Sequence, residues 1–425
     1  MKHQKLTLFT VGAPRIMMLA AVLALVAMPM HPQLTRSLYD GIQTVRLIAD
    51  DDPLLPPVVR LGGHVEVSFD AMTHEYTRYV YKIVFCNADW SRNDDLFESD
   101  WLEGFNSQPI EDYATSLNTS MLYTHYSFAI PNADVRLLLP GNYRVEVWAD
   151  DGRNEGPVAE ACFSLLDPDM SVASRVSSNT DIDFNQSHQQ LTWSLNYGSR
   201  NVVDPERELH TVVMQNRRHD NLVWDLPPNI RHANGCEWTH RRELIFPAGN
   251  EFHKFELLNT RVAGMGVDRM VWEEPVYHVV LFGSERPHTY TYAPDANGAW
   301  VVRRSGSDDE DTEAEYVVVH FSLKSPRLAG GDVYVSGQWD NGFPDPRCRM
   351  RYDERQGAYE VGVLLKQGYY NYQFLQTDAD GRGHSDRTDG NFYETENEYV
   401  VLVYHRPPGE RYDALVAYQR ILSGK

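Results

Sequence analysis

The sequence predicts an all-β protein built from tandem β-sandwich domains that follow an N-terminal signal peptide. Apolar and polar residues alternate with period two in many short runs, such as Val65 to Phe69 and Tyr143 to Val147. This alternation is typical of half-buried strands, because successive side chains point to opposite faces of a sheet. Turn-forming sequences such as Asn234-Gly235 separate the runs. Helical periodicity is nearly absent, and only residues 94 to 105 resemble a helical turn, so short strands dominate.

Residues 1 to 30 are predicted to be a secretory signal peptide. Lys2, Lys5 and Arg15 precede an apolar run at residues 16 to 30 that is too short to span a bilayer comfortably. Ala27 is the best candidate for the last residue removed, and an uncleaved anchor is the alternative. No cysteine lies nearby, so we expect an exported protein with no direct lipid anchor.

The first predicted sandwich comprises residues 37 to 167. Within it, Gly141 to Val147 shares a Gly-x-Tyr-x-apolar-x-apolar pattern with Gly368 to Phe374 much later in the chain. In immunoglobulin-like sandwiches, a tyrosine near the start of a late strand bonds through its hydroxyl to the backbone of the preceding corner. Tyr143 and Tyr370 are candidates for that role. The alternative is an ordinary turn followed by an ordinary strand.

Composition shifts divide the rest of the chain into a middle sandwich at 168 to 304, an acidic linker at 305 to 313 and a C-terminal sandwich at 314 to 425. The linker sequence SGSDDEDTE is polar and strongly acidic, which favours a solvated connection over a calcium site. Asn297-Gly298 predicts a hairpin between residues 290 to 292 and residues 300 to 302, because both residues tolerate the positive φ of a tight turn.

The four cysteines show no C-x-x-C spacing, which argues against a zinc ribbon or a thioredoxin-like pair. They are Cys86, Cys162, Cys236 and Cys348. Cys86 and Cys162 both fall in strand-like runs of the first sandwich, so a disulfide between them is possible in an exported chain. The alternative is that all four are small buried hydrophobic residues.

The net charge excludes some classes of partner. The chain carries 39 Lys and Arg against 60 Asp and Glu, for a formal net charge of −21. A surface this negative repels phosphate backbones and anionic lipid headgroups. We therefore expect no nucleic-acid partner.

The sequence contains no motif that indicates an enzyme. It has no G-x-S-x-G, Walker loop, G-x-G-x-x-G or H-E-x-x-H pattern. We therefore predict no catalytic, cofactor-binding or metal-binding residues and no cofactor. A glycan-processing enzyme with two carboxylates stays open, on fold analogy alone, because some acidic pair always lies close in a chain with 60 acidic residues.

Two segments of the predicted C-terminal sandwich carry a family resemblance. They are Val333 to Asp340, which contains Trp339, and Lys366 to Phe374, which contains Gly-Tyr-Tyr-Asn-Tyr. In these segments the sandwich is similar to the glycogen-binding type of early-set sandwich. The match is partial, because Trp339 is shifted and the later sugar-stacking residues do not fall into place. The resemblance implies an early-set fold and leaves a periplasmic glycan-binding protein as the alternative function.

Five separated blocks of the sequence carry a wider resemblance, which covers residues 41 to 421. The blocks comprise Cys86 to Trp90; Asn118-Thr119 with Tyr123 to Tyr126 and Pro131-Asn132; Gln215 to Asn221; Phe246 to Phe252; and Gly390 to Tyr399 with Arg406 to Gly409 and Arg411 to Asp413. In these blocks and in their order, the chain resembles the plug proteins of the type IX secretion system. His219 departs from the pattern, because that family is expected to carry Trp there.

The resemblance implies a non-enzymatic periplasmic protein that associates with the outer membrane through a protein partner. That partner would be the giant outer-membrane translocon barrel, whose periplasmic mouth the plug occludes when no substrate is passing. A seal that must open is expected to bind through a moderate, partly polar interface.

Overall fold

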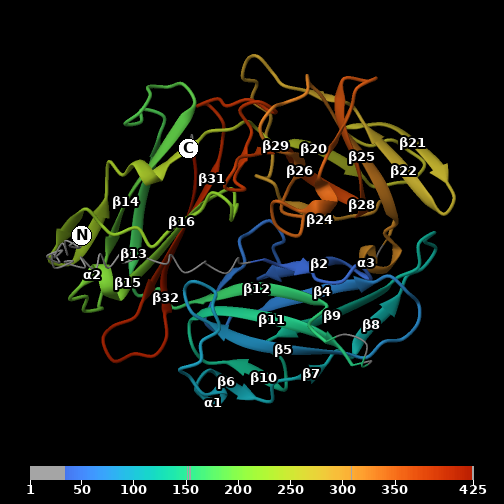
Figure 1. The fold of residues 1–425 in the computed structure, drawn as a ribbon. Helices are drawn as coiled ribbons and strands as arrows, with labels where there is room; N and C mark the ends of the chain where they lie inside the picture. Colours follow the sequence, from blue (N-terminus) through green and yellow to red (C-terminus); the bar gives the residue numbers. More distant parts are fainter. Residues whose placement is uncertain (1–33, 151, 153–154, 308, 424–425) are drawn as a thin grey trace, which may run out of the picture. The chain divides into compact units, whose positions relative to one another are not determined.

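The computed structural model describes residues 34 to 150, 152, 155 to 307 and 309 to 423. The predicted signal peptide at residues 1 to 30 lies outside the described residues. The described residues belong to one unit of the fold. Its sheets are stacked in pairs as three β-sandwiches, which confirms the predicted all-β class (Figure 1).

The first sandwich packs a six-stranded sheet against a four-stranded sheet, and both face one apolar core around Phe69, Tyr81 and Val145. The six-stranded sheet contains β1 (Arg36–Ser37), β12 (Ala159–Leu166), β11 (Gly141–Ala149), β5 (Tyr79–Cys86) and β7 (Gln108–Pro109), with β3 (Val58–Arg60) beside β12. The four-stranded sheet contains β2 (Ile42–Ala49), β4 (Val65–Ala71), β9 (Thr124–Ile130) and β8 (Asp112–Thr115). A small ribbon of β6 (Leu102–Gly104) and β10 (Val135–Leu137) follows α1 (Glu98–Trp101).

The second sandwich buries stacked Trp193 and Trp238, whose ring centroids lie 3.6 Å apart, between its two sheets. One sheet contains β13 (Ser171–Ser177), β14 (His188–Asn196), β18 (Gly235–Trp238) and β17 (Ile230–His232), with β19 (Ile245–Pro247) beside β14. The other contains β16 (Val223–Trp224), β15 (Leu209–Gln215), β31 (Glu398–His405) and β32 (Ala414–Leu422). The short helices are α2 (Pro205–Glu208) and η1 (Arg242–Leu244).

The third sandwich has its core around Phe255, Phe321 and Tyr370. One sheet contains β20 (His253–Leu257), β29 (Gly368–Thr377) and β24 (Trp300–Val302), with β26 (Val333–Ser336) and β30 (Gly383–His384) also on β29. The other contains β21 (Val267–Glu273), β22 (Val276–Leu281), β25 (Tyr316–Lys324), β28 (Ala358–Lys366) and β27 (Arg351–Asp353), with β23 (Ser284–Glu285) beside β25. The short helices are α3 (Glu310–Glu313) and η2 (Pro346–Cys348).

The strand pairing does not follow the predicted division at residues 304 to 314. β31 and β32, from the C-terminal end, complete the second sandwich, while β20, β21, β22 and β24 complete the third. Figure 1 shows the red β31 beside the green β15, and the yellow β22 beside the orange β25. These sandwiches are therefore discontinuous in sequence, because strand pairing depends on complementary apolar faces and not on chain order.

Two tyrosine hydroxyls bond to the backbone as the shared sequence pattern predicts. The Tyr143 hydroxyl donates to the Leu139 carbonyl at 2.7 Å, and the Tyr370 hydroxyl donates to the Lys366 carbonyl at 2.6 Å. Both rings are buried. Each tyrosine therefore fixes the corner before its strand, in the first and third sandwiches respectively.

The hairpin predicted at Asn297-Gly298 is wrong, although the turn itself forms. Both residues have positive φ, 50° and 89°. Residues 290 to 292 form no strand, and β24 pairs with β29 instead. The Asn371 side chain accepts a bond from the Ala296 backbone N–H at 2.6 Å, so a tertiary contact holds the segment before the turn.

Candidate functional site at the junction of the three sandwiches

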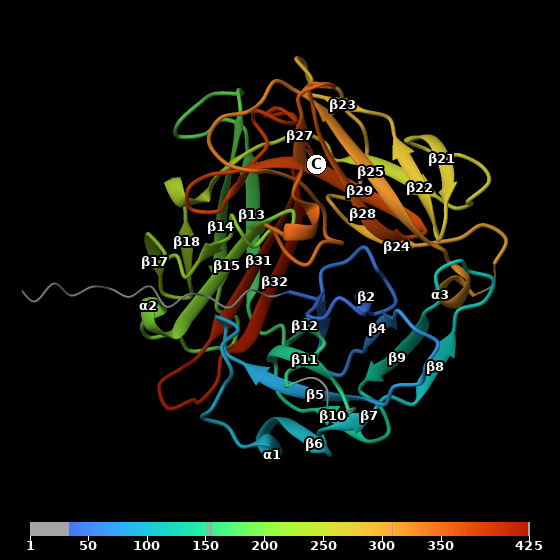
Figure 2. The ribbon, with the colours of Figure 1, turned by 45° about the vertical axis from the view of Figure 1, so that its right-hand side comes forward.

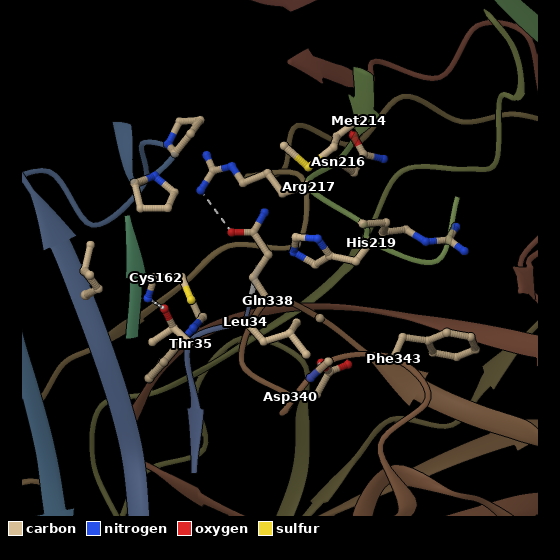
Figure 3. Close-up of a pocket in the computed structure, with 18 of the residues that line it drawn as sticks. Leu34, Thr35, Cys162, Met214, Asn216, Arg217, His219, Gln338, Asp340 and Phe343 are labelled. Atoms are coloured by element: carbon tan, nitrogen blue, oxygen red, sulfur yellow. Dashed lines mark hydrogen bonds between the residues drawn. The ribbon is translucent and has the colours of Figure 1, made fainter. Parts of the chain in front are cut away.

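Arg217 contacts all three sandwiches and marks the place where they meet. It follows β15 in the second sandwich and has a φ of 57°, so the chain turns sharply there. Its Nε donates to Glu398 Oε1 at 2.7 Å in the second sandwich, and its Nη1 donates to Gln338 Oε1 at 3.1 Å in the third. Its Nη2 donates to the carbonyl of Leu54 in the first. Figure 3 shows Arg217 reaching toward Gln338.

Glu398 is the charged partner that holds Arg217 in place. Its side chain has no exposed surface, and a second guanidinium, from Arg420, also donates to it. The Glu398 backbone N–H donates to the Asn216 side chain at 2.8 Å. A buried carboxylate is costly unless it is paired and hydrogen-bonded, so Glu398 requires its arginine partners.

A cavity of about 200 Å³ lies beside Arg217, between the three sandwiches (Figure 3). All three sandwiches contribute both apolar and polar side chains to its lining. The lining includes Leu34, Cys162, Met214, Leu402, Arg217, His219, Gln338 and Asp340.

Two titratable groups of this cavity have shifted pKa values that lower its charge. Burial lowers the pKa of His219 to about 4, and its Nδ1 has no hydrogen-bond partner. Burial raises the pKa of the Asp340 carboxyl to about 6, although Ser336 donates a hydrogen bond to it at 2.7 Å. At neutral pH the imidazole is therefore uncharged. His219 stands where the family resemblance leads one to expect Trp, and its unpaired nitrogen is the local consequence.

The titratable side chains that line the cavity include His219, Asp340 and Cys162. Across the described residues, no group of three or more His, Cys, Asp or Glu side chains could hold a metal ion. Burial raises the pKa of the Cys162 thiol well above its ordinary value. The hydrogen bonds of Arg217 beside the cavity join the three sandwiches to each other.

A buried ion pair joins the first and third sandwiches. Lys366 Nζ on β28 lies 2.6 Å from Asp70 Oδ2 on β4, and neither side chain has exposed surface. The Tyr316 hydroxyl donates to the same Asp70 oxygen at 2.6 Å, and His125 Nδ1 lies 2.7 Å from the other oxygen. Burial favours a raised pKa for Asp70, but the charge of Lys366 and the hydrogen bonds outweigh it and lower the pKa to about 2.

The predicted acidic linker is part of this contact. Residues 310 to 313 form α3, and Lys366 Nζ donates to the Asp311 carbonyl at 2.6 Å. The Asp311 carboxylate pairs with Arg46 on β2, and the Tyr123 hydroxyl donates to the Ala314 carbonyl at 2.8 Å. The segment therefore docks on the first sandwich through its carboxylates and carbonyls, where composition predicted a solvated connection.

The first and second sandwiches share an apolar core and a set of polar contacts. Ala88 and Leu166 pack against Val212, Leu402 and Tyr404. The Ala88 backbone N–H donates to Asp413 Oδ2 at 2.8 Å, and the Tyr404 hydroxyl donates to Asn142 Oδ1 at 2.9 Å. These two hydrogen bonds cross the contact beside the apolar residues and tie the first sandwich to the second.

The five blocks that carry the family resemblance lie at these contacts. Ala88 and Asp413 come from the first and last blocks and bond to each other, and Arg217 in the third block bonds to Glu398 in the fifth. In the fourth block, the Gly249 backbone N–H donates to Asn391 Oδ1, again in the fifth, at 2.7 Å. Residues of these four blocks, together with Tyr123 of the second block, therefore take part in contacts between distant segments of the chain.

The residues that sequence reasoning missed are Asp70, Lys366 and Glu398. Each lies within an ordinary strand pattern, and the only available signal was a charged residue in a buried run, as in the sequence LLKQGYY around Lys366.

All four cysteines lie in the described part of the chain, and their thiols are free and buried. Cys86 is on β5 and Cys162 is on β12, and β11 lies between these strands in the sheet. Strands two positions apart in a sheet are about 10 Å apart, whereas a disulfide needs Cα atoms within about 7 Å. The suggested bridge between Cys86 and Cys162 is therefore not formed in this structure.

Three of the aromatic residues that suggested glycan binding lie in the core, while Tyr369 is half-buried. The Trp339 side chain is 9% exposed, and its Nε1 donates to the Asn371 carbonyl at 2.8 Å. Tyr370 and Tyr372 are also buried. These rings offer no open face on which a sugar could stack.

No helix among the described residues has the length and apolar character needed to cross a membrane.

Comparison with known proteins supplies the family. Residues 42 to 167 match the family model described as "Type 9 secretion system plug protein 1st domain". The crystal structure of a hypothetical protein from Parabacteroides merdae ATCC 43184 is 37% identical, with a TM-score of 0.89. The match covers 92% of this chain and 100% of that chain. No curated protein matches.

Two other solved structures overlap only loosely. The C-terminal domain of the antigen I/II-family protein AspA from Streptococcus pyogenes has 8% identity and a TM-score of 0.17, with 90% of this chain and 99% of that chain covered. Dimeric latent PorU from Porphyromonas gingivalis has 10% identity and a TM-score of 0.14, with 90% and 34% covered. Scores this low carry no argument about fold or function.

Proposed function

The chain belongs to the type IX secretion system plug protein family, and from this we propose that it is a non-enzymatic periplasmic plug. In this proposal the protein sits at the periplasmic mouth of the outer-membrane translocon barrel and occludes it when no substrate is passing. The family gives the chain a role in type IX secretion; the occlusion of the barrel is the proposed step.

The observation that carries the proposal is the fastening of the three sandwiches. Arg217 bonds to all three, and the buried pair of Asp70 and Lys366 joins the first to the third. A chain of loosely linked domains would leave gaps in a wide aqueous pore, because such domains move relative to one another. A fastened body can close a pore by bulk alone, without chemistry or a cofactor.

The charge of the chain fits a partner that is a protein and not a lipid surface. A net charge of −21 opposes adsorption to anionic lipid headgroups. We therefore expect the protein to be held at the outer membrane only through the barrel. The contact should be moderate in area and partly polar, because the plug must leave when substrate arrives.

The test is a measurement of ion conductance through the barrel. The protein, tagged at its C-terminus, is first purified from detergent-solubilised envelopes, and mass spectrometry identifies a very large outer-membrane barrel that comes with it. The barrel, freed of this protein, is then placed in a planar lipid bilayer. Adding the purified protein on the periplasmic side should lower the conductance in a saturable way.

The matched control is heat-unfolded protein at the same concentration, which should leave the conductance unchanged. If the folded protein binds the barrel but saturating amounts leave the conductance unchanged, the occlusion step of the proposal is wrong. If no barrel co-purifies under detergents that preserve other envelope complexes, the proposed partner is wrong.

A further inference from the structure

The outer edge of β21 is an unpaired strand edge at one end of the third sandwich. β21 is the last strand of its six-stranded sheet and pairs only with β22. Within the described residues, no backbone hydrogen bond reaches residues 269 to 273 from the other side. In Figures 1 and 2, β21 is the outermost strand of this sheet.

The side chains along this edge are unusually open for a strand. Val271 is 41% exposed and Trp272 is 48% exposed, and Trp272 packs edge-on against Tyr277 with ring centroids 4.7 Å apart. Natural edges are commonly protected by lysine, proline or a bulge. The strand has one bulge, between Val267 and Arg269, but residues 269 to 273 contain neither lysine nor proline.

A row of unpaired backbone N–H and C=O groups is complementary only to another extended backbone. The sequence of the edge indicates which backbone fits. When two copies of Arg269 to Glu273 are placed antiparallel with Val271 opposite Val271, Arg269 of each copy faces Glu273 of the other. In the same register Met270 faces Trp272.

Both faces of the ladder are complementary in this register. Arg269, Val271 and Glu273 share the face that lines a groove with His278, so opposite charges flank a central apolar pair there. Met270 and Trp272 lie on the other face. Opposite-charge and apolar cross-strand pairs both stabilise a sheet, whereas like charges placed opposite destabilise it. A shift of the register by one residue places Asp268 opposite Glu273 in one direction and Met270 opposite Glu273 in the other.

We propose that the outer edge of β21 pairs antiparallel with β21 of a second copy of this chain, with Val271 at the two-fold axis. The pairing joins the two sheets into one continuous sheet across the dimer. It is an isologous contact, so the same residues serve both copies. Asp268, at the bulge, and Glu274, beyond the end of the strand, lie outside the five-residue ladder. The contact does not depend on the proposed plug function.

The test is a charge exchange read by sedimentation equilibrium. Because the contact is small, self-association should be weak, and the purified protein should be examined from about 10 µM to about 500 µM. We expect a monomer–dimer equilibrium for the unaltered chain. R269E and E273R each place two like-charged pairs across the contact, so each should lower the association constant about fivefold or more.

The double variant R269E/E273R restores both opposite-charge pairs and should recover the dimer. An equimolar mixture of the two single variants should form a heterodimer, because each position then again faces its opposite charge. These positions are exposed at a strand edge, and a thermal unfolding curve for each variant verifies that it is folded.

The control variant is Arg327→Glu, which reverses an equally exposed arginine paired with Glu354 at 3.1 Å. It should dimerise like the unaltered chain. A monomer throughout the concentration range overturns the proposal. Dimerisation that the single variants do not weaken, or that the double variant does not recover, overturns it as well.

Discussion

Lys366 Nζ and Asp70 Oδ2 lie 2.6 Å apart, both side chains are fully buried, and the two residues belong to different sandwiches. Their pairing therefore links the packing of the third sandwich to that of the first. Lys366 also lies 4.2 Å from the centre of the Tyr123 ring, so a cation–π contact adds to the ion pair.

Removing one partner of this pair should cost more stability than removing both. Asp70→Asn or Lys366→Met alone leaves a buried charge unpaired, and each should lower the free energy of unfolding by about 3–5 kcal/mol. The double variant D70N/K366M should be clearly more stable than the sum of the two losses predicts. Urea unfolding of the four proteins measures this coupling, and additive losses would contradict it.

The same carboxyl should give the protein an acid-sensitive range of stability. The pKa of Asp70 is about 2 in the folded chain, against an ordinary 3.8. A carboxyl whose pKa is lower in the folded chain stabilises the fold. The full stabilisation is present at pH values above the pKa of the unfolded chain, and it is lost as pH falls from about 4 to about 2. The loss is on the order of 2 kcal/mol. Unfolding midpoints measured in this range should fall less steeply for Asp70→Asn, and parallel curves would contradict the assignment.

His219 should affect the free energy of unfolding in a different pH range. Its pKa is lowered from 6.5 to about 4, so the unfolded chain binds a proton between these values while the folded chain does not. Stability is then lost as pH falls from about 6.5 to about 4, by on the order of 3 kcal/mol. Asp340, with its raised pKa, opposes this trend in the unaltered chain. The measurement is therefore the difference in unfolding free energy between His219→Phe and the unaltered chain at each pH, which should grow toward pH 4.

Arg217→Ala should loosen the junction of the sandwiches while each sandwich keeps its core. The variant loses bonds to three partners, although Arg420 still pairs with Glu398. We expect a loss of about 2–3 kcal/mol and faster proteolysis at the connections between sandwiches. Arg327→Ala, which removes an exposed arginine paired with an exposed glutamate, is the control and should cost less than about 1 kcal/mol. Equal losses in the two variants would show that Arg217 has no special role.

The four thiols should be unreactive in the folded protein. Burial raises the pKa of the Cys86 thiol to about 12, and Cys162, Cys236 and Cys348 are buried as well. A thiol reagent at neutral pH should detect no free thiol in the native chain and all four in denaturant without reductant. Detection of only two in denaturant would indicate a disulfide.

Sequence patterns identified the features that depend on neighbouring residues. Alternation identified strands such as β4 and β11, and the shared Gly-x-Tyr pattern identified the corners at Tyr143 and Tyr370. Such features can be predicted from sequence, because side-chain direction alternates along a strand and a corner tyrosine bonds to the backbone only a few residues upstream.

Contacts between distant parts of the chain were decided by the tertiary structure and could not be predicted from local sequence patterns. The pairing of β15 with β31 across the predicted domain boundary follows from matching apolar faces nearly two hundred residues apart, and no local pattern encodes it. The ion pair of Asp70 and Lys366 is equally remote, because a charged residue in a strand reveals neither its burial nor its partner. The local chain therefore specified the strands and their corners, and long-range packing specified which strands share a sandwich and where the sandwiches meet.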